Sequence, residues 1–92
     1  MHQGEASFEW DEANESELSR HHITAQEVEQ VFDSDPAWAS NKRNRPGNRL
    51  MVGRTDGGRA LTIVVRVNAN SETIRAITGW DSTSGDRTRY RR

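Results

Sequence analysis

The 92-residue chain contains no cysteine. Disulfide bonds, thiolate metal sites and a cysteine nucleophile are therefore excluded. The sequence also lacks an apolar run long enough to cross a membrane, and its first residues, MHQGEAS, do not resemble a signal peptide. We therefore expect a cytoplasmic protein with no membrane contact.

Apolar residues are scarce, at 32% of the chain, whereas charged residues make up 29%. A chain of this length and composition can bury one small core. It still carries Trp, Phe and Val-Ile runs, which distinguish it from a disordered chain. We expect a flexible N-terminus over residues 1–7 and a single domain over residues 8–92.

Charge is sorted along the chain. Residues 1–41 hold ten acidic residues and one basic residue, for a net charge of −9, whereas residues 42–92 hold twelve basic and four acidic residues, for +8. Only one basic residue, Lys42, is a lysine, and arginine is the side chain that grips phosphate or carboxylate bidentately. Two interpretations stay open: a basic face that binds a polyanion, or acidic helices packed on a basic sheet.

Capping signals predict two helices in the acidic half. Asp11 stands at an N-cap position, which predicts a helix from about Asp11 to His21. Thr24 and Glu27 form a capping box, and apolar residues recur on one face of the second helix until Pro36 stops it.

The basic half has the alternation of strands. The strand-like segments are residues 49–54, 59–67 and 73–80, with shorter ones at 8–10 and from Trp38 onwards. An Asp-Gly turn joins the first two of these long segments, and residues 82–92 suit a short helix. The pattern predicts an α+β fold: two N-terminal helices packed on a three- or four-stranded antiparallel sheet, with a short C-terminal helix.

Several motifs, in order, resemble the BrnT family of toxins from bacterial type II toxin–antitoxin systems. They are FEWD at 8–11, Asn14, Arg20-His21, Val31-Phe32, LMVGRT at 50–55 and GRALTIVV at 58–65. The end matches more weakly, through Ile77-Thr78, Thr83 and the arginine-rich tail to Tyr90. The resemblance covers about residues 8–90 and lies in the order and spacing of the motifs.

This resemblance implies a fold similar to RelE-type ribonucleases and RNA cleavage that needs neither metal nor cofactor. It also implies a DNA-binding, BrnA-like antitoxin as partner. A homodimer and a heterotetramer with the antitoxin are both compatible with it.

Metal-free RNA cleavage needs a base, an acid and cations that stabilise the charged transition state. The candidate catalytic residues are His21, Arg54, Arg59 and Asp86. His21 aligns with the family's histidine, and histidine as a residue type can transfer protons near neutral pH, but the favoured interpretation is a histidine that caps the helix C-terminus.

The candidate RNA-binding residues are basic or aromatic side chains in the second half. They are Lys42, Arg43, Arg45, Arg66, Arg75, Trp80, Arg87 and Tyr90. Arginines on neighbouring strands would clamp phosphates if their side chains shared one face, and would otherwise be solvated. An exposed Trp80 among arginines could stack a base.

The chain departs from the family at four positions. Trp80 stands where the family commonly has arginine, Asp86 where it has glutamate, His22 where it has glycine, and Glu17 where some members have histidine. Three functions therefore stay open: a toxin-like endoribonuclease, a catalytically degenerate relative that acts through partner binding, and a non-catalytic RNA- or DNA-binding module.

Overall fold

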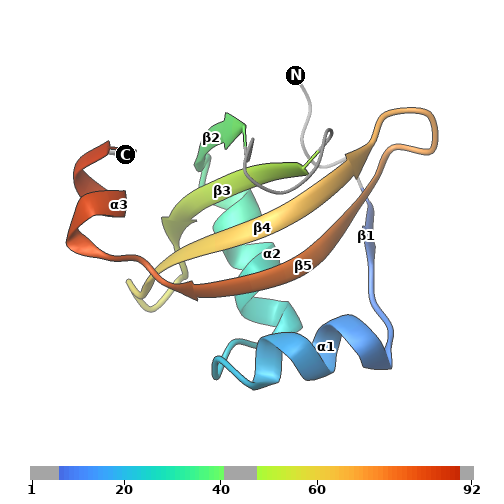
Figure 1. Cartoon of the computed structure of the whole chain (residues 1–92), viewed down its shortest axis with the longest axis horizontal. Helices are drawn as coiled ribbons and strands as arrows, with labels where there is room; N and C mark the ends of the chain where they lie inside the picture. The colour runs from blue at the N-terminus through green and yellow to red at the C-terminus, as the bar shows by residue number, and fades with distance from the viewer. Residues whose placement is uncertain (1–6, 41–47, 90–92) are drawn as a thin grey trace.

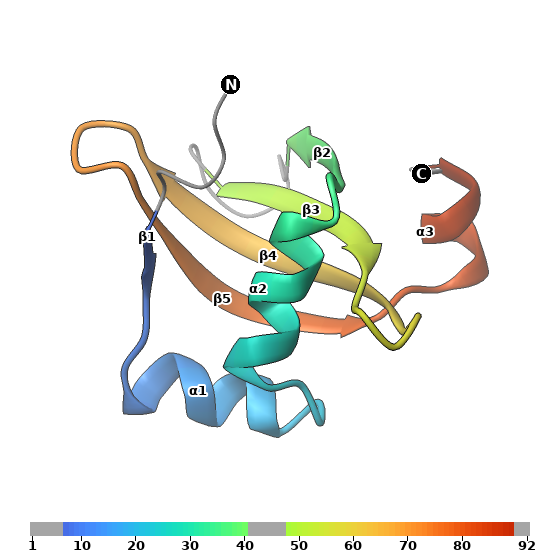
Figure 2. The ribbon, with the colours of Figure 1, turned by 180° about the vertical axis from the view of Figure 1, so that it is seen from behind.

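The fold is a mixed sheet with two helices on one face and a third helix beside one end of the sheet (Figures 1 and 2). The computed structural model describes residues 7–40 and 48–89. Its elements are β1 (Ser7–Glu9), α1 (Glu12–Ser19), α2 (Ala25–Asp33), β2 (Ala37–Ser40), β3 (Asn48–Arg54), β4 (Ala60–Asn68), β5 (Thr73–Asp81) and α3 (Ser84–Arg89). Within these ranges, no helix combines the length and the apolar character needed to span a membrane.

The sheet has the order β1-β5-β4-β3-β2, and β1 runs parallel to β5 while the other pairs are antiparallel. The α+β class and the helix positions are confirmed. The prediction of a three- or four-stranded, wholly antiparallel sheet is wrong in strand number and in one strand direction, because the described residues form five strands and β1 pairs with β5 in parallel. The three residues of β1 are too few to show alternation, and their partner lies more than sixty residues away in sequence.

Both N-terminal helices begin at the expected caps. The Asp11 carboxylate accepts the Asn14 N–H, while the Asn14 side chain accepts the Asp11 N–H. Thr24 and Glu27 exchange the same pair of hydrogen bonds at the start of α2. Capping fixes these starts because it satisfies backbone N–H groups that have no partner within the helix.

The core lies between the two N-terminal helices and the sheet. Leu18, Val28, Val31 and Phe32 from the helices meet buried strand residues such as Ile63. Two tryptophans border this core: Trp10 is half-buried against it, and Trp38 remains 39% exposed with its ring edge-on to Phe32. This cluster thus lies on one face of the sheet.

Strand alternation turns other side chains to the opposite face. Gly53 faces α2, because a Cβ added there would lie 3.2 Å from Val31. Its neighbours Val52 and Arg54 therefore point away from the helices, as do their cross-strand partners Thr62 and Ala60. This second face carries the candidate site.

Candidate functional site

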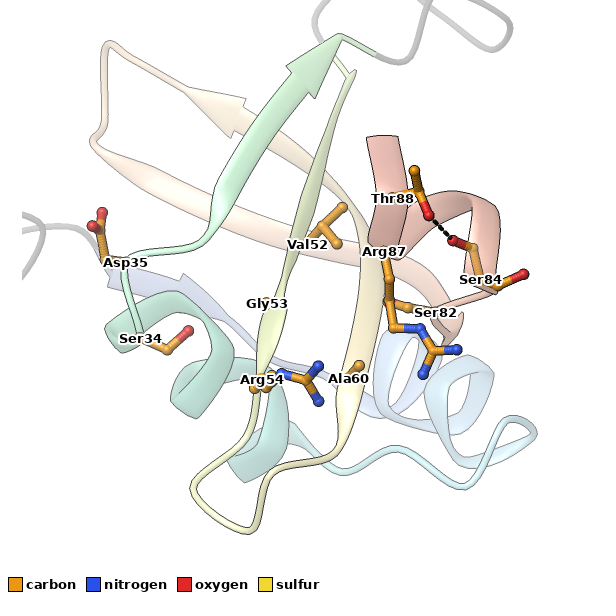
Figure 3. Close-up of a pocket in the computed structure, with 10 residues that line it drawn as sticks. All are labelled: Ser34, Asp35, Val52, Gly53, Arg54, Ala60, Ser82, Ser84, Arg87 and Thr88. Carbon is orange, nitrogen blue, oxygen red and sulfur yellow. Dashed lines mark hydrogen bonds between the residues drawn. The ribbon is translucent and has the colours of Figure 1, made fainter. Parts of the chain in front are cut away.

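A groove of about 460 Å³ lies on the second face of the sheet, between β3 and α3 (Figure 3). Its lining comes from the α2–β2 connection, the facing ends of β3 and β4, and the segment that includes α3. The lining residues are Ser34, Asp35, Val52, Gly53, Arg54, Ala60, Ser82, Ser84, Arg87 and Thr88. Four distant stretches of sequence therefore meet around one hollow.

Two arginines reach this groove from opposite walls. Arg54 belongs to β3 and Arg87 to α3, and both line the groove. In Figure 3 the Arg54 guanidinium extends towards Ala60, and the Arg87 side chain runs beside Ser82. Arg54 donates one hydrogen bond, of 3.0 Å, to the Gly58 carbonyl. Within the described residues, neither arginine lies within ion-pair distance of a carboxylate. Asp35 also lines the groove.

Hydroxyl groups complete the lining. Ser82 shares a 2.9 Å hydrogen bond with Thr62, and Thr88 donates to the Ser84 carbonyl at 2.9 Å. Ser34 donates to the Val31 carbonyl at 2.6 Å. Guanidinium and hydroxyl groups are the side chains that bind phosphate oxygens in proteins. The groove therefore has the chemistry of an anion site.

The Asp86 carboxylate lies at the base of α3 and does not line the groove. One of its oxygens accepts hydrogen bonds from the Thr62 hydroxyl (3.1 Å), the Trp80 indole (3.1 Å) and the Thr83 backbone N–H (3.2 Å). Burial raises the pKa of Asp86, but these hydrogen bonds outweigh it and the pKa lies below its usual value. Asp86 is therefore ionised at neutral pH and is not an acid poised to donate a proton.

Trp80 is half-buried and its indole nitrogen points to Asp86. The condition for base stacking, an exposed Trp80, is therefore not met. It lies opposite Thr62 on the neighbouring strand, and these two residues hold the same carboxylate. Where the family resemblance leads one to expect arginine, this chain supplies a neutral N–H donor.

Arg59 lies on the other side of the hairpin from Arg54, with all five of its N–H groups engaged. Nε and Nη2 donate to Asp81 at 2.7 and 3.1 Å, and Nη1 donates to Glu27 at 3.1 Å. The remaining bonds go to the backbone carbonyls of His22, at 2.7 Å, and His21, at 3.4 Å. Since a guanidinium has five donors, none is left for a phosphate.

His21 is absent from the groove lining and belongs to the turn between α1 and α2. Its Nε2 lies 3.4 Å from a Glu17 carboxylate oxygen. Hydrogen bonding from Thr78 at 2.8 Å is the leading cause that lowers the pKa of Glu17, and Arg20 adds to it. The position matches the interpretation of His21 as a residue that closes α1.

The remaining arginines of the sheet do not converge on the groove. Arg75 forms a bidentate ion pair with Asp11, at 2.9 and 3.1 Å, and Arg66 is exposed opposite Arg75. The condition for joint phosphate clamping, a face shared by the sheet arginines, is therefore not met by Arg59 and Arg75. Four further candidates lie outside the described residues: Lys42, Arg43, Arg45 and Tyr90.

Two features of the site were not predicted from the sequence: the first is the set of hydroxyl groups in the groove, and the second is the pair of carboxylates that hold Arg59. A signal existed for the first, because Ser82-Thr83-Ser84 follows a strand directly. None existed for the second, because Glu27 and Asp81 are remote in sequence from Arg59. Within residues 7–40 and 48–89, no group of three His, Asp or Glu side chains is arranged as a metal site.

No protein-family model matches the chain, and no curated protein matches it in sequence.

Proposed function

We propose that this protein is a BrnT-like, toxin-like endoribonuclease that binds the RNA backbone in the groove between β3 and α3. The observation that carries the proposal is the pair Arg54 and Arg87. Both face one groove lined by hydroxyl groups, and within the described residues neither has a carboxylate partner. Two such cations favour a ligand with closely spaced negative charges, as a phosphodiester backbone has.

The proposed reaction is cleavage by the neighbouring 2′-hydroxyl group. The 2′-oxygen attacks phosphorus and loses its proton to water, and the bond from phosphorus to the 5′-oxygen breaks. The leaving oxygen takes a proton from water, so the products are a 2′,3′-cyclic phosphate and a 5′-hydroxyl end. Arg54 and Arg87 stabilise the extra charge on the phosphorane-like transition state, which is the role that sets the rate here.

A non-cleaving relative that binds RNA is the second candidate. Two observations favour it: Arg59 has no free donor, and no histidine lines the groove among the described residues. Such a protein would keep the groove and the partner surface but would not cleave RNA.

The family resemblance implies a DNA-binding antitoxin as the partner of either candidate, and we expect both to act in the cytoplasm. The exposed acids of α1, Glu12 and Glu15, would attract a basic segment of it.

The test measures RNA binding and cleavage, in EDTA, by the wild-type protein and by Arg54→Ala and Arg87→Ala. Arg20→Ala is the matched control, because it removes the same charge from an exposed side chain directly after α1. We expect each groove variant to weaken RNA binding about 5- to 15-fold, which corresponds to the loss of about 1–1.5 kcal/mol for one solvent-accessible phosphate contact, and to slow cleavage. The control should change binding less than about twofold.

Three results separate the candidates. Cleavage that persists in EDTA and falls in both groove variants supports the ribonuclease. Binding without cleavage by folded wild-type protein supports the second candidate. Equal behaviour of the groove variants and Arg20→Ala contradicts both candidates at this site.

A further inference from the structure

The short helix α3 carries one of the two groove arginines, and among residues 84–88 the side chain that bonds it to the sheet is a single half-buried carboxylate. We propose that Asp86 is a positioning residue that fixes α3 on the sheet and thereby directs Arg87 into the groove. That this positioning matters for RNA binding rests on the function proposed above. The geometry of the anchor does not depend on it.

Few other contacts hold α3 in the described structure. Ser84, Gly85, Arg87 and Thr88 are exposed, whereas Asp86 is half-buried. The Thr88 hydroxyl is bonded within the helix itself. In residues 84–88, the side-chain hydrogen bonds to the sheet are therefore those of Asp86. A six-residue helix is too short to be stable alone, so its position depends on such contacts.

The sheet offers Asp86 a rigid base. Thr62 is fully buried in the central strand β4, and Trp80 lies opposite it on β5. Both donate to the same carboxylate oxygen at 3.1 Å. Hydrogen bonds to an ionised carboxylate are roughly twice as strong as neutral ones. One carboxylate thus joins two strands to the helix.

Asp86 also defines where α3 begins. Its backbone N–H donates to the Thr83 hydroxyl at 3.0 Å, and its carboxylate accepts the Thr83 N–H at 3.2 Å. This reciprocal pair is a capping box, which sets the start of the helix. Because the same side chain is tied to the sheet, the rotation of α3 about its axis is fixed as well. The direction of the next side chain, Arg87, follows from that rotation.

A double-mutant cycle on RNA affinity tests the proposal in the full chain. Asp86→Ala should weaken binding about 5- to 15-fold, as Arg87→Ala does, because the arginine is no longer directed into the groove. The double variant Asp86→Ala/Arg87→Ala should bind no more weakly than Arg87→Ala alone. Adding Arg54→Ala to Asp86→Ala should instead multiply the two losses, since Arg54 lies on β3.

Milder variants keep the test decisive if Asp86→Ala fails to fold. Trp80→Phe removes one donor and keeps an aromatic ring, and Thr62→Val removes the other at nearly constant shape. In the wild-type background, each substitution should weaken RNA binding about two- to fivefold. In the Arg87→Ala background, each should weaken it by less than about twofold more. Asp86→Asn, which keeps an acceptor oxygen, should recover part of the affinity lost in Asp86→Ala.

Amide hydrogen exchange supplies a readout that needs no RNA. In Asp86→Ala or Trp80→Phe, residues 84–88 should lose protection while β4 keeps it. Full additivity of Asp86→Ala with Arg87→Ala would overturn the proposal, and so would unchanged exchange in α3. If Arg54→Ala and Arg87→Ala leave RNA binding intact, the proposed function fails, and the exchange result alone then decides whether Asp86 positions α3.

Discussion

Arg54 and Arg59 lie on either side of one turn, yet their environments are opposite. Arg54 is exposed and, among the described residues, its side chain bonds only to a backbone carbonyl, whereas Arg59 is surrounded by the carboxylates of Glu27 and Asp81 and by two backbone carbonyls. Alternation explains the split, because Arg54 and Ala60 are cross-strand partners and Arg59 therefore points the other way. An arginine's formal charge thus does not tell whether it is available to a ligand.

We predict that Arg59→Lys destabilises the protein by about 1–2 kcal/mol. The value lies between those of surface and buried ion pairs, and the groups here are partly exposed. A lysine ammonium has three donors and no planar fork, so it cannot hold Asp81, Glu27 and both carbonyls together. Urea unfolding monitored by circular dichroism measures the change. A loss no larger than that of Arg20→Ala would contradict the structural role of Arg59.

His22 occupies a backbone conformation that favours glycine. Its φ is 60°, and it lies at the end of α1 where Ile23 N–H donates to the Leu18 carbonyl and His22 N–H to that of Ser19. This arrangement is a Schellman motif, whose left-handed residue is usually glycine. The observation gives a physical reason for the glycine that the family resemblance leads one to expect here.

We predict that His22→Gly stabilises the protein by about 0.5–1 kcal/mol, because it relieves the left-handed strain of a residue with a Cβ atom. The carbonyl that accepts from Arg59 is retained. His22→Ala is the matched control and should bring no gain, since alanine keeps the Cβ. Thermal unfolding of both variants measures the difference. Equal midpoints, or a higher midpoint for His22→Ala than for His22→Gly, would show the explanation to be wrong.

At the scale of elements, β5 approaches the core beneath it closely at Gly79. A Cβ added at Gly79 would lie 2.7 Å from Ile63 Cδ1 and 3.0 Å from the Thr62 carbonyl oxygen. It would also lie 3.3 Å from Ile23 Cδ1, in the turn that follows α1. The absence of a side chain at this position therefore lets the α1–α2 turn pack directly on the sheet.

We predict that Gly79→Ala destabilises the protein by about 1–3 kcal/mol, the usual cost of overpacking a core. The isoleucine side chain can shift, but the backbone carbonyl of β4 cannot move without disturbing the sheet. Gly57→Ala is the control, because the nearest atom to its added Cβ is 3.9 Å away. Denaturant midpoints for the two variants should differ clearly, and a Gly79→Ala value equal to that of Gly57→Ala would refute the close approach.

At the scale of the whole molecule, the two charged halves of the sequence are partly matched to each other. Arg75 pairs with Asp11, and Arg59 with Glu27. The interpretation in which acidic helices pack on a basic sheet is therefore correct for these pairs. It does not account for Arg54 and Arg87, whose charges face the groove. Internal pairing thus leaves a local excess of positive charge on the face opposite the helices.

We predict that the protein loses stability in acid. Hydrogen bonds from arginine are the leading cause that lowers the pKa of Asp11, through Arg75, and of Asp81, through Arg59. A depressed native pKa gives stability that is present above the unfolded value, near 3.8, and is lost as the pH falls through the native pKa. The free energy of unfolding should therefore be constant from about pH 7 to about pH 5 and fall below about pH 4.

Urea titrations across this pH range measure the effect. Arg75→Gln is the informative variant, because it leaves Asp11 without its cationic partner and should make the acid slope shallower. If the free energy of unfolding falls with pH equally steeply in Arg75→Gln and in the wild type, the Arg75–Asp11 ion pair does not contribute to the loss of stability in acid. Rising stability below about pH 4 would contradict the sign of the pKa shifts.

The sequence by itself determined the local structure. The caps at Asp11 and Thr24, the stop before Pro36 and the alternation of residues 59–67 depend on neighbours a few residues away, so they were predictable. The charge sorting and the absence of cysteine were likewise visible directly. Each of these features needs only short-range physics or composition.

Only the tertiary structure decided which charges are available and what they face. The groove joins residues from the α2–β2 connection, β3, β4 and α3, and its Arg87 is directed by a carboxylate held across two strands. The parallel β1–β5 pairing and the enclosure of Arg59 also unite distant segments. Such contacts depend on how the elements pack in space, which local propensity and pattern do not encode.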